Sequence, residues 1–128
     1  MSKKILIVEG HPDLRRLLIL SLRHVGYKIL EADTGGSGIA LTLSENPDLV
    51  LVDISLPDVS GLEVAKKIKQ NPKTAQIPLI ALSGSSEREI ACKALEAGMT
   101  AYLMKPADTQ QLVKLIEKMT QPRSGNES

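Results

Sequence analysis

The segment that most constrains the fold is Leu49–Asp53, an unbroken apolar run that ends in an aspartate. Val50 and Val52 are β-branched, and Pro57 follows as a turn signal. Such a run predicts a strand that is buried on both faces, as in the centre of a parallel sheet. Because an unpaired buried charge is strongly destabilising, we expect Asp53 at the open carboxyl end of the strand, close to a cation. In open α/β sheets, this end is where ligands bind.

Four more short apolar runs predict one strand each, and helical patterns separate them. The strands are expected at 5–8, 27–30, 78–82 and 101–104. Apolar residues at helical spacing predict five helices, at about 12–25, 34–44, 61–70, 87–97 and 109–119. Strands that alternate with helices specify an α/β sheet with helices on both faces. Right-handed crossovers then bring the loops after all the strands to one edge.

The apolar residues of three predicted helices also give expectations about packing. In the second helix we expect Ile39, Ala40 and Leu43 on the inward side, and in the fourth helix Ile90, Ala91, Ala94 and Leu95. In the first helix, Ile19 and Leu20 extend the apolar stripe beyond what one core face needs. These two residues indicate either a docking surface or burial under a neighbouring loop.

The length of 128 residues, 42% of them hydrophobic, is enough for one domain with its own core. Phe and Trp are absent and Tyr occurs twice, so the core must be aliphatic. We expect a single domain over residues 1–121, followed by a polar C-terminal tail over residues 122–128.

The charge and the cysteine content bear on partners and location. A net charge of +1 argues against nucleic acid or an anionic membrane as the main partner. Cys92 stands alone, which excludes an internal disulfide and fits a reducing compartment. The apolar run near the N-terminus is too short for a signal peptide or a membrane span. We therefore expect a cytoplasmic protein.

Polar side chains follow four of the five predicted strands: Glu9, Asp53, Ser83 and Lys105. Two carboxylates, a hydroxyl and an ammonium at one edge suit phosphoryl transfer. A carboxylate can act as the nucleophile and form an aspartyl-phosphate. The phosphoryl oxygens then need cations and hydrogen-bond donors, which a metal ion, a lysine and a serine supply.

Four segments together resemble the receiver domain of bacterial response regulators, of the chemotaxis type in two-component signalling. They are, in order, Ile5–Glu9, Leu51–Gly61, Ile80–Gly84 and Tyr102–Pro106. The resemblance covers residues 3 to about 120, and the order and separations of the segments make it specific. It implies a flavodoxin-like, doubly wound, five-stranded parallel sheet of order 2-1-3-4-5 with five helices.

The resemblance also implies roles for individual residues. Asp53 would be the phosphoacceptor, supplied by the phosphohistidine of a sensor histidine kinase or of a histidine phosphotransfer protein. Lys105 would pair with Asp53 and then with the phosphoryl group, and Ser83 would hydrogen-bond a phosphoryl oxygen. Tyr102 would be the aromatic switch that follows Ser83 inward, although an ordinary edge-strand tyrosine also fits the sequence.

The metal site that the resemblance implies differs from the family's pattern at Gly10. Glu9, Asp53 and the backbone carbonyl of Ser55 would hold Mg²⁺. The family has two consecutive acids after the first strand, the second of which binds the metal directly, whereas this chain has Glu9 followed by Gly10. The loss of one carboxylate predicts weaker Mg²⁺ binding. A natural and an engineered glycine both fit the sequence.

For partners, the resemblance implies a downstream protein target that contacts the fourth helix, the fifth strand and the fifth helix. Arg88, Lys93 and Lys114 are the candidate contacts there. A weak homodimer is a further expectation, and nucleic acid and membrane are not expected as partners. We expect no enzymatic activity beyond slow self-phosphorylation and dephosphorylation at Asp53.

Two other functions stay open. A pseudo-receiver would serve as an interaction module without phosphate, and Gly10 is the main argument for it. A flavin carrier shares the fold, but the sequence lacks a Ser/Thr-rich phosphate loop after the first strand and aromatics to stack on flavin. His11 lies beside the acidic residues. A solvated loop histidine is a simpler interpretation of it than a catalytic base or a metal ligand.

Overall fold

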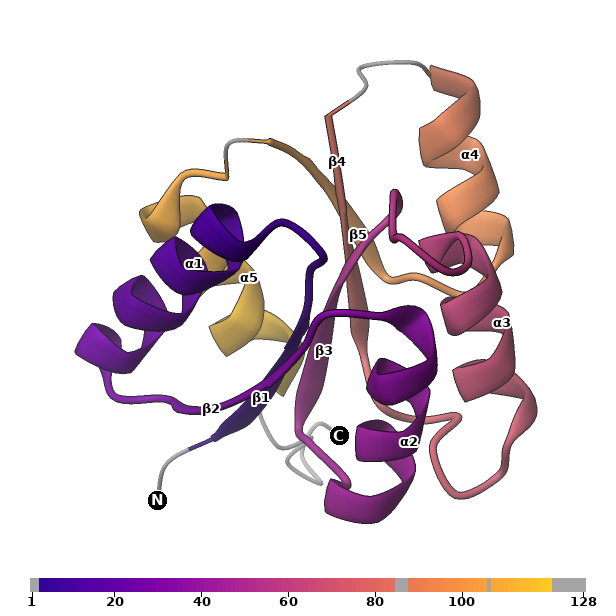
Figure 1. Ribbon diagram of the computed structural model, residues 1–128, viewed down its shortest axis with the longest axis horizontal. Coiled ribbons are helices and arrows are strands. Elements are labelled where there is room, and N and C mark those ends of the chain that lie inside the picture. The colour runs from indigo at the N-terminus through magenta and orange to yellow at the C-terminus, as the bar shows by residue number, and fades with distance from the viewer. Residues whose placement is uncertain (1–2, 85–87, 106, 121–128) are drawn as a thin grey trace, which may run out of the picture.

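The computed structural model describes residues 3–84, 88–105 and 107–120, so the predicted polar tail at 122–128 lies outside it (Figure 1). Five strands pair in parallel in the order β2-β1-β3-β4-β5, which is the order expected from the sequence. The strands are β1 (Lys4–Val8), β2 (Lys28–Ala32), β3 (Leu49–Asp53), β4 (Leu79–Ser83) and β5 (Ala101–Met104). The helices are α1 (Pro12–Val25), α2 (Gly35–Glu45), α3 (Gly61–Gln70), α4 (Arg88–Glu96) and α5 (Thr109–Thr120).

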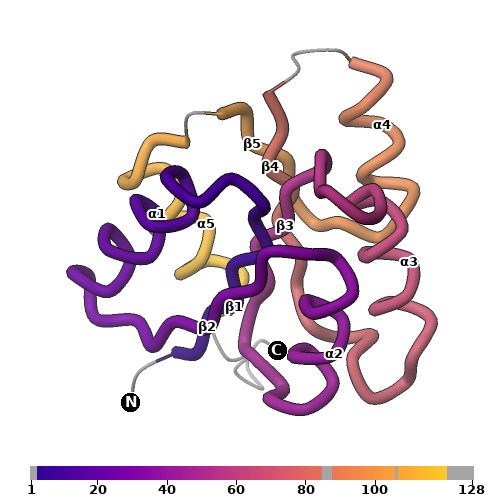
Figure 2. Tube along the Cα trace, viewed as in Figure 1, coloured from indigo at the N-terminus to yellow at the C-terminus, as the bar shows by residue number. Residues whose placement is uncertain are grey.

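Helices cover both faces of the sheet, with α1 and α5 on one side and α2, α3 and α4 on the other (Figures 1 and 2). Successive strand side chains point to opposite faces, so each strand supplies both cores. In β3, Leu51 packs toward α1 and α5, whereas Val50 and Val52 pack toward the other helices. This two-sided burial explains why the strands are continuous apolar runs rather than alternating ones. None of the helices in the described ranges combines the length and hydrophobicity that crossing a bilayer requires.

The register of the sheet brings three polar residues to one edge. Val8 of β1 pairs with Val52 of β3, so Glu9 and Asp53 occupy neighbouring positions at the strand ends. On the other side of β3, Asp53 pairs with Leu82 of β4, and Ser83 follows. The carboxylate of the central strand is therefore flanked by the ends of both adjacent strands.

Local sequence signals set the ends of α1. His11 is the N-cap, and its Nδ1 accepts a hydrogen bond from the Leu14 amide at 3.4 Å. Pro12 follows at the first helical position, where its missing N–H has no consequence. Gly26 ends the helix with φ 114°, a left-handed conformation that favours glycine. The His11 cap therefore fixes where the loop after β1 ends, and Gly26 fixes where the connection to β2 begins.

The predicted inward faces of α2 and α4 were partly wrong. In α2 the buried residues are Gly35, Gly38 and Thr42, whereas Leu43 is 45% exposed. The helix approaches the sheet so closely that a Cβ on Gly38 would lie 2.8 Å from Val8 Cγ2, so small residues form the contact face. In α4, Ala94 is fully buried as expected, whereas Leu95 is 59% exposed. In α2, hydrophobicity alone gave the wrong face because close approach of the backbone decides the packing.

Candidate functional site

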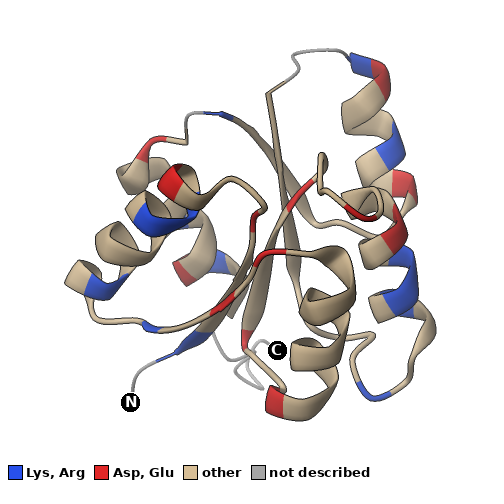
Figure 3. Ribbon diagram, viewed as in Figure 1, with Lys and Arg blue, Asp and Glu red and all other residues tan. Residues whose placement is uncertain are grey.

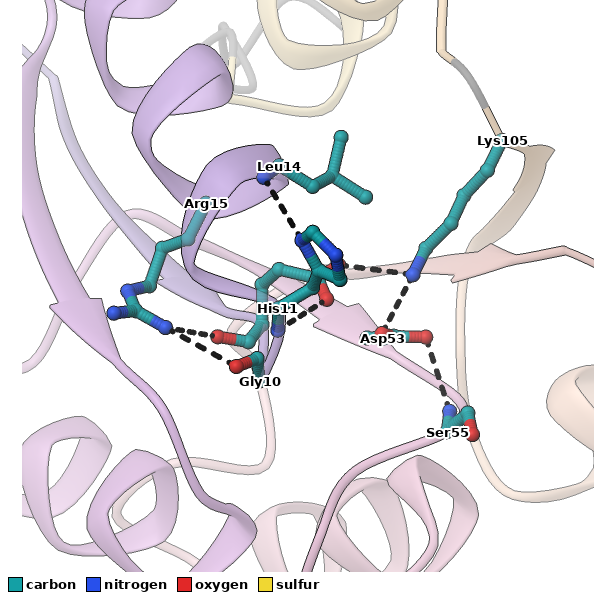
Figure 4. Close-up of polar contacts among 8 residues, drawn as sticks. Gly10, His11, Leu14, Arg15, Asp53, Ser55 and Lys105 are labelled. Carbon is teal, nitrogen blue, oxygen red and sulfur yellow. Dashed lines mark hydrogen bonds and ion pairs between the residues drawn. The ribbon is translucent and has the colours of Figure 1, made fainter.

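The ends of β1, β3 and β5 surround an open cavity of about 400 Å³ (Figure 4). Its lining consists of the acidic and basic groups predicted from the sequence, together with residues of the loops after β1 and β3. The lining residues are Glu9, Gly10, His11, Asp53, Ser55, Leu56, Pro57 and Lys105. We call this the acid cavity.

Lys105 bridges the two acids of the acid cavity. Its Nζ lies 2.6 Å from Asp53 Oδ2 (Figure 4). The same Nζ lies 3.0 Å from Glu9 Oε1. Burial alone would lower the pKa of Lys105, but hydrogen bonds and charge interactions with Asp53 and Glu9 outweigh burial and raise it. The ammonium is therefore held in its charged form at the mouth of the central strand.

Glu9 is 1% exposed, although it is a carboxylate. Burial raises its pKa, and the neighbouring Asp53 carboxylate raises it further. The backbone amide of His11, which donates to Glu9 Oε2 at 3.1 Å, and the Lys105 ammonium offset part of this rise. Both carboxylate oxygens of Glu9 are therefore held by partners, but burial makes its ionised form less favourable.

Asp53 is 2% exposed and is oriented by contacts to both carboxylate oxygens. Oδ1 accepts a hydrogen bond from the Ser55 amide at 3.0 Å, and Oδ2 accepts one from Lys105 Nζ. Ser55 itself is tied by a bridge to Ser60, the N-cap of α3. The loop after β3 thus fixes the carboxylate against rotation.

Neither Ser83 nor Tyr102 is among the residues that line the acid cavity. Ser83 is the last residue of β4 and is 5% exposed, and its carbonyl accepts a hydrogen bond from the Lys105 amide at 2.8 Å. Tyr102 is half-buried and packs against the core on the side of α2, α3 and α4. The structure therefore brings Asp53 and Lys105 into contact, with Ser83 at the adjoining strand end.

Gly10 leaves the acid cavity one carboxylate short of the pattern implied by the resemblance. A Cβ at this position would lie 2.8 Å from Pro57 Cδ, closer than real Cβ contacts. A side chain at position 10 therefore requires the loop after β3 to shift. In the described part of the chain, no group of three or more His, Cys, Asp or Glu residues is arranged to hold a metal ion.

Two supporting residues were not predicted from the sequence. Arg15 donates from Nη1 to the Glu9 carbonyl at 2.9 Å and so holds the turn that carries Glu9. Asp58 accepts hydrogen bonds from the amides of Gly35 at 2.8 Å and Gly36 at 3.0 Å, which joins the loop after β3 to the start of α2. The only sequence signal for Asp58 is an acid in a loop, because its partners lie more than twenty residues earlier.

The His11 cap had a usable signal, because the residue before a proline at the start of a helix is the usual N-cap. The solvated-loop interpretation missed this role. His11 also lines the acid cavity, so it contributes to both the helix and the site.

Comparison with known proteins decides the family. Residues 5–117 match the response regulator receiver domain. The chain belongs to this family. The receiver is 34% identical over 117 residues to the phosphate regulon transcriptional regulatory protein PhoB of Pseudomonas aeruginosa, a match that covers 91% of the chain and 51% of PhoB. The receiver thus spans about half the length of this relative.

Solved structures show the same architecture. The CheY-like receiver domain protein of Methanospirillum hungatei matches with a TM-score of 0.85 and 32% identity, over 93% of this chain and 94% of that one. The receiver domain of the sensor histidine kinase PA1611 of Pseudomonas aeruginosa matches with a TM-score of 0.87 and 25% identity, over 94% and 98% of the two chains. That structure has a magnesium ion coordinated in its active-site cleft. The flavodoxin-like receiver fold predicted from the sequence is confirmed, and the flavin-carrier alternative loses its support.

Proposed function

We propose that this receiver is phosphorylated on Asp53 by a sensor histidine kinase or a histidine phosphotransfer protein. The observation that carries the proposal is the contact of Lys105 Nζ with Asp53 Oδ2 at 2.6 Å and with Glu9 Oε1 at 3.0 Å, in a cavity open to solvent. An oriented carboxylate beside a fixed ammonium is the arrangement that phosphoryl transfer to an aspartate requires.

In the proposed reaction, a carboxylate oxygen of Asp53 forms a bond to phosphorus while the bond from phosphorus to the donor's histidine nitrogen breaks. The freed imidazole takes up a proton from solvent. Lys105 neutralises charge on the phosphoryl oxygens, and the Ser83 hydroxyl donates to one of them. Slow self-phosphorylation and dephosphorylation at Asp53 are the only catalysis that we propose.

Glu9, Asp53 and the Ser55 carbonyl are the groups that would hold Mg²⁺. The donor set fits this cation, because Mg²⁺ is usually bound by one or two carboxylates together with water and phosphate oxygens. Glu9 Oε1 supports the fit, since it is buried and forms no hydrogen bond within the described residues, only the ion pair with Lys105. When bound, the metal would supply positive charge to the phosphoryl group. The missing carboxylate at Gly10 weakens its binding.

The phosphorylated receiver would signal by binding a downstream protein, which is the chemotaxis type of output. Phosphorylation would draw Ser83 toward the phosphoryl group and let Tyr102 move inward behind it. The face formed by α4, β5 and α5 would then contact the partner through Arg88, Lys93 and Lys114. A weak homodimer is part of the same proposal.

A specific observation favours a second function, that of a pseudo-receiver that binds partners without phosphate. Lys105 already bridges both acids, and Gly10 contributes no carboxylate, so the acid cavity is partly neutralised without a metal. In this alternative the bridged arrangement of Lys105 would be the functional state.

Incubation with acetyl phosphate and Mg²⁺ followed by mass spectrometry separates the two functions. We expect the wild-type receiver to gain the mass of one phosphoryl group and the Asp53→Asn variant to gain none. Gly10→Asp is expected to increase labelling most when it is combined with Pro57→Ala, because the Cβ at position 10 would otherwise meet Pro57. Pro57→Ala alone is the matched control.

Labelling of Asp53→Asn would refute the proposed acceptor. If the chain with Gly10 stays unlabelled while the Gly10→Asp, Pro57→Ala variant is labelled, the pseudo-receiver is the correct function of the cavity with Gly10.

A further inference from the structure

His11 lies in the acid cavity but has no part in the reaction proposed above. It lines the cavity together with Asp53 and Lys105, and its side chain is exposed to solvent. Figure 4 shows its ring between the start of α1 and Lys105. Figure 3 shows acidic segments at the ends of β1 and β3 and a basic segment after β5. A group that enters the cavity therefore comes near the imidazole as well as these charges.

The contacts of His11 determine which of its ring nitrogens donates. Nδ1 accepts a hydrogen bond from the Leu14 amide at 3.4 Å, as the N-cap of α1. A neutral imidazole carries one proton, and the nitrogen that accepts a hydrogen bond lacks it, so the proton lies on Nε2. Within the described residues, Nε2 donates no hydrogen bond. The ring therefore offers an N–H group to a molecule that enters the cavity.

The backbone around His11 holds the ring in this place. The His11 amide donates to Glu9 Oε2 at 3.1 Å, and Pro12 follows at the first position of α1. Glu9 Oε1 in turn lies 3.0 Å from Lys105 Nζ, which lies 2.6 Å from Asp53 Oδ2. A short series of contacts thus connects His11 with the carboxylate that would receive the phosphoryl group. A donor that is already held in place loses little freedom when it binds a charged group.

A phosphoryl group on Asp53 has more oxygens than the proposed reaction supplies with protein donors. Its three outer oxygens carry negative charge and need cations or hydrogen-bond donors. Lys105 and Ser83 provide for two of them, and Gly10 contributes no side chain. Among the described residues that line the acid cavity, His11 is the one besides Lys105 with a side-chain N–H group. His11 Nε2 is therefore suited to the remaining oxygen.

We propose that His11 binds the phosphoryl group on Asp53, with Nε2–H donating to one phosphoryl oxygen. This role rests on the proposed function, the phosphorylation of Asp53, and adds a residue to the set that the resemblance implies. The same ring then caps α1 through Nδ1 and binds the phosphoryl group through Nε2. The donor is uncharged, so it does not replace the metal ligand that is missing at Gly10.

Two variants separate the roles of the two ring nitrogens. His11→Asn keeps a good N-cap for α1 but has no N–H group at the place of Nε2. In His11→Gln the longer side chain brings an amide N–H to the place of Nε2, but glutamine is not among the preferred N-caps. We therefore expect His11→Gln to melt at a lower temperature than His11→Asn and yet to bind the phosphoryl group better. A purely structural role of His11 would give the same order in both measurements.

The probes are acetyl phosphate with Mg²⁺, followed by mass spectrometry, and beryllofluoride with Mg²⁺, which imitates the phosphoryl group on an aspartate. His11→Asn should lower the rate of labelling and the affinity for beryllofluoride by about tenfold, because a hydrogen bond to a charged oxygen is lost. In the ¹⁵N-labelled parent receiver, beryllofluoride should move the Nε2–H signal of His11 downfield and slow its exchange with water. His24→Asn is the matched control, since His24 is exposed in the last turn of α1 and should be labelled as fast as the parent.

Equal labelling rates and equal beryllofluoride affinities of the parent receiver and His11→Asn would overturn the proposed role of His11, while the phosphorylation of Asp53 would stand. An unchanged Nε2–H signal in the beryllofluoride complex would overturn this role as well. If the parent receiver itself gains no mass, the proposed function fails and the role of His11 fails with it. Slower labelling of His11→Asn, partial recovery in His11→Gln and a shifted Nε2–H signal together would support it.

Discussion

At the scale of single residues, the acid cavity is a problem of charge balance. Two carboxylates that are almost completely buried share one ammonium, so the group carries a net negative charge without a bound cation. Each carboxylate accepts one hydrogen bond from a backbone amide and pairs with Lys105, and burial raises the pKa of Glu9. We therefore expect the ionised Glu9 side chain to be the group in this site that lowers the stability of the folded state.

Replacement of Glu9 by Gln should remove a pH dependence of stability. Because the pKa of Glu9 is raised in the folded state, its contribution is fully present below about pH 4.3, the ordinary value for glutamate. The contribution is lost as the pH rises through the raised pKa, since the unfolded chain ionises first. Urea unfolding at a series of pH values should therefore show that Glu9→Gln gains stability relative to the wild type from about pH 4.3 upward.

Glu117→Gln is the matched control, since Glu117 is exposed on α5 and its charge change is the same. Its stability should follow the wild type across the same pH range. If Glu9→Gln follows the wild type as well, the buried carboxylate does not carry the pH dependence.

At the scale of elements, Asp58 joins the loop after β3 to the start of α2. The hydrogen bonds from the Gly35 and Gly36 amides lower the pKa of Asp58. A carboxylate at this position also meets the positive end of the α2 dipole. The same loop carries Ser55 and Pro57, which line the acid cavity, so α2 supports the site without touching Asp53.

Asp58→Asn should weaken this connection and reduce the sensitivity to acid. Because the pKa of Asp58 is lowered by folding, its stabilisation is present above about pH 3.9 and is lost as the pH falls through the lower folded value. We expect a lower melting temperature at neutral pH and faster hydrogen exchange at the Gly35 and Gly36 amides. Asp33→Asn is the control, because Asp33 is an exposed acid next to the same helix. Unchanged exchange in Asp58→Asn would show that α2 does not depend on this cap.

The same elements show what the sequence could predict. Continuous apolar runs such as β3 predicted the strands and the sheet, because each strand is buried on both faces. Asp53 and Lys105 were predicted as neighbours because parallel strands end at one edge. The buried face of α2 was not predicted, because Gly38 lies there through close approach of the backbone to β1 and not through hydrophobicity. The Asp58 contact was not either, because a loop-to-helix hydrogen bond leaves no periodic signal.

At the scale of the whole molecule, one sheet divides two aliphatic cores. The chain has no Phe or Trp, and its two tyrosines lie on opposite sides of the sheet. Tyr27 packs against the core under α1 and α5, and Tyr102 packs against the core under α2, α3 and α4. Each ring therefore reports on one core, and the pair tests whether the cores unfold together.

Leu51→Ala removes a fully buried side chain from the core under α1 and α5 only. The cavity should lower the free energy of unfolding by about 3 kcal/mol. Because β3 contributes alternate residues to both cores, we expect both tyrosines to report the same lowered urea midpoint by NMR of the labelled rings, with an unchanged slope. Leu95→Ala, at a 59% exposed position, should stay within about 0.5 kcal/mol of the wild type. If the urea midpoint reported by Tyr102 stays at its wild-type value while that reported by Tyr27 falls, the helices on the two faces of the sheet unfold separately. A change at Asp53, at the end of β3, could then affect the helices on one face without affecting those on the other.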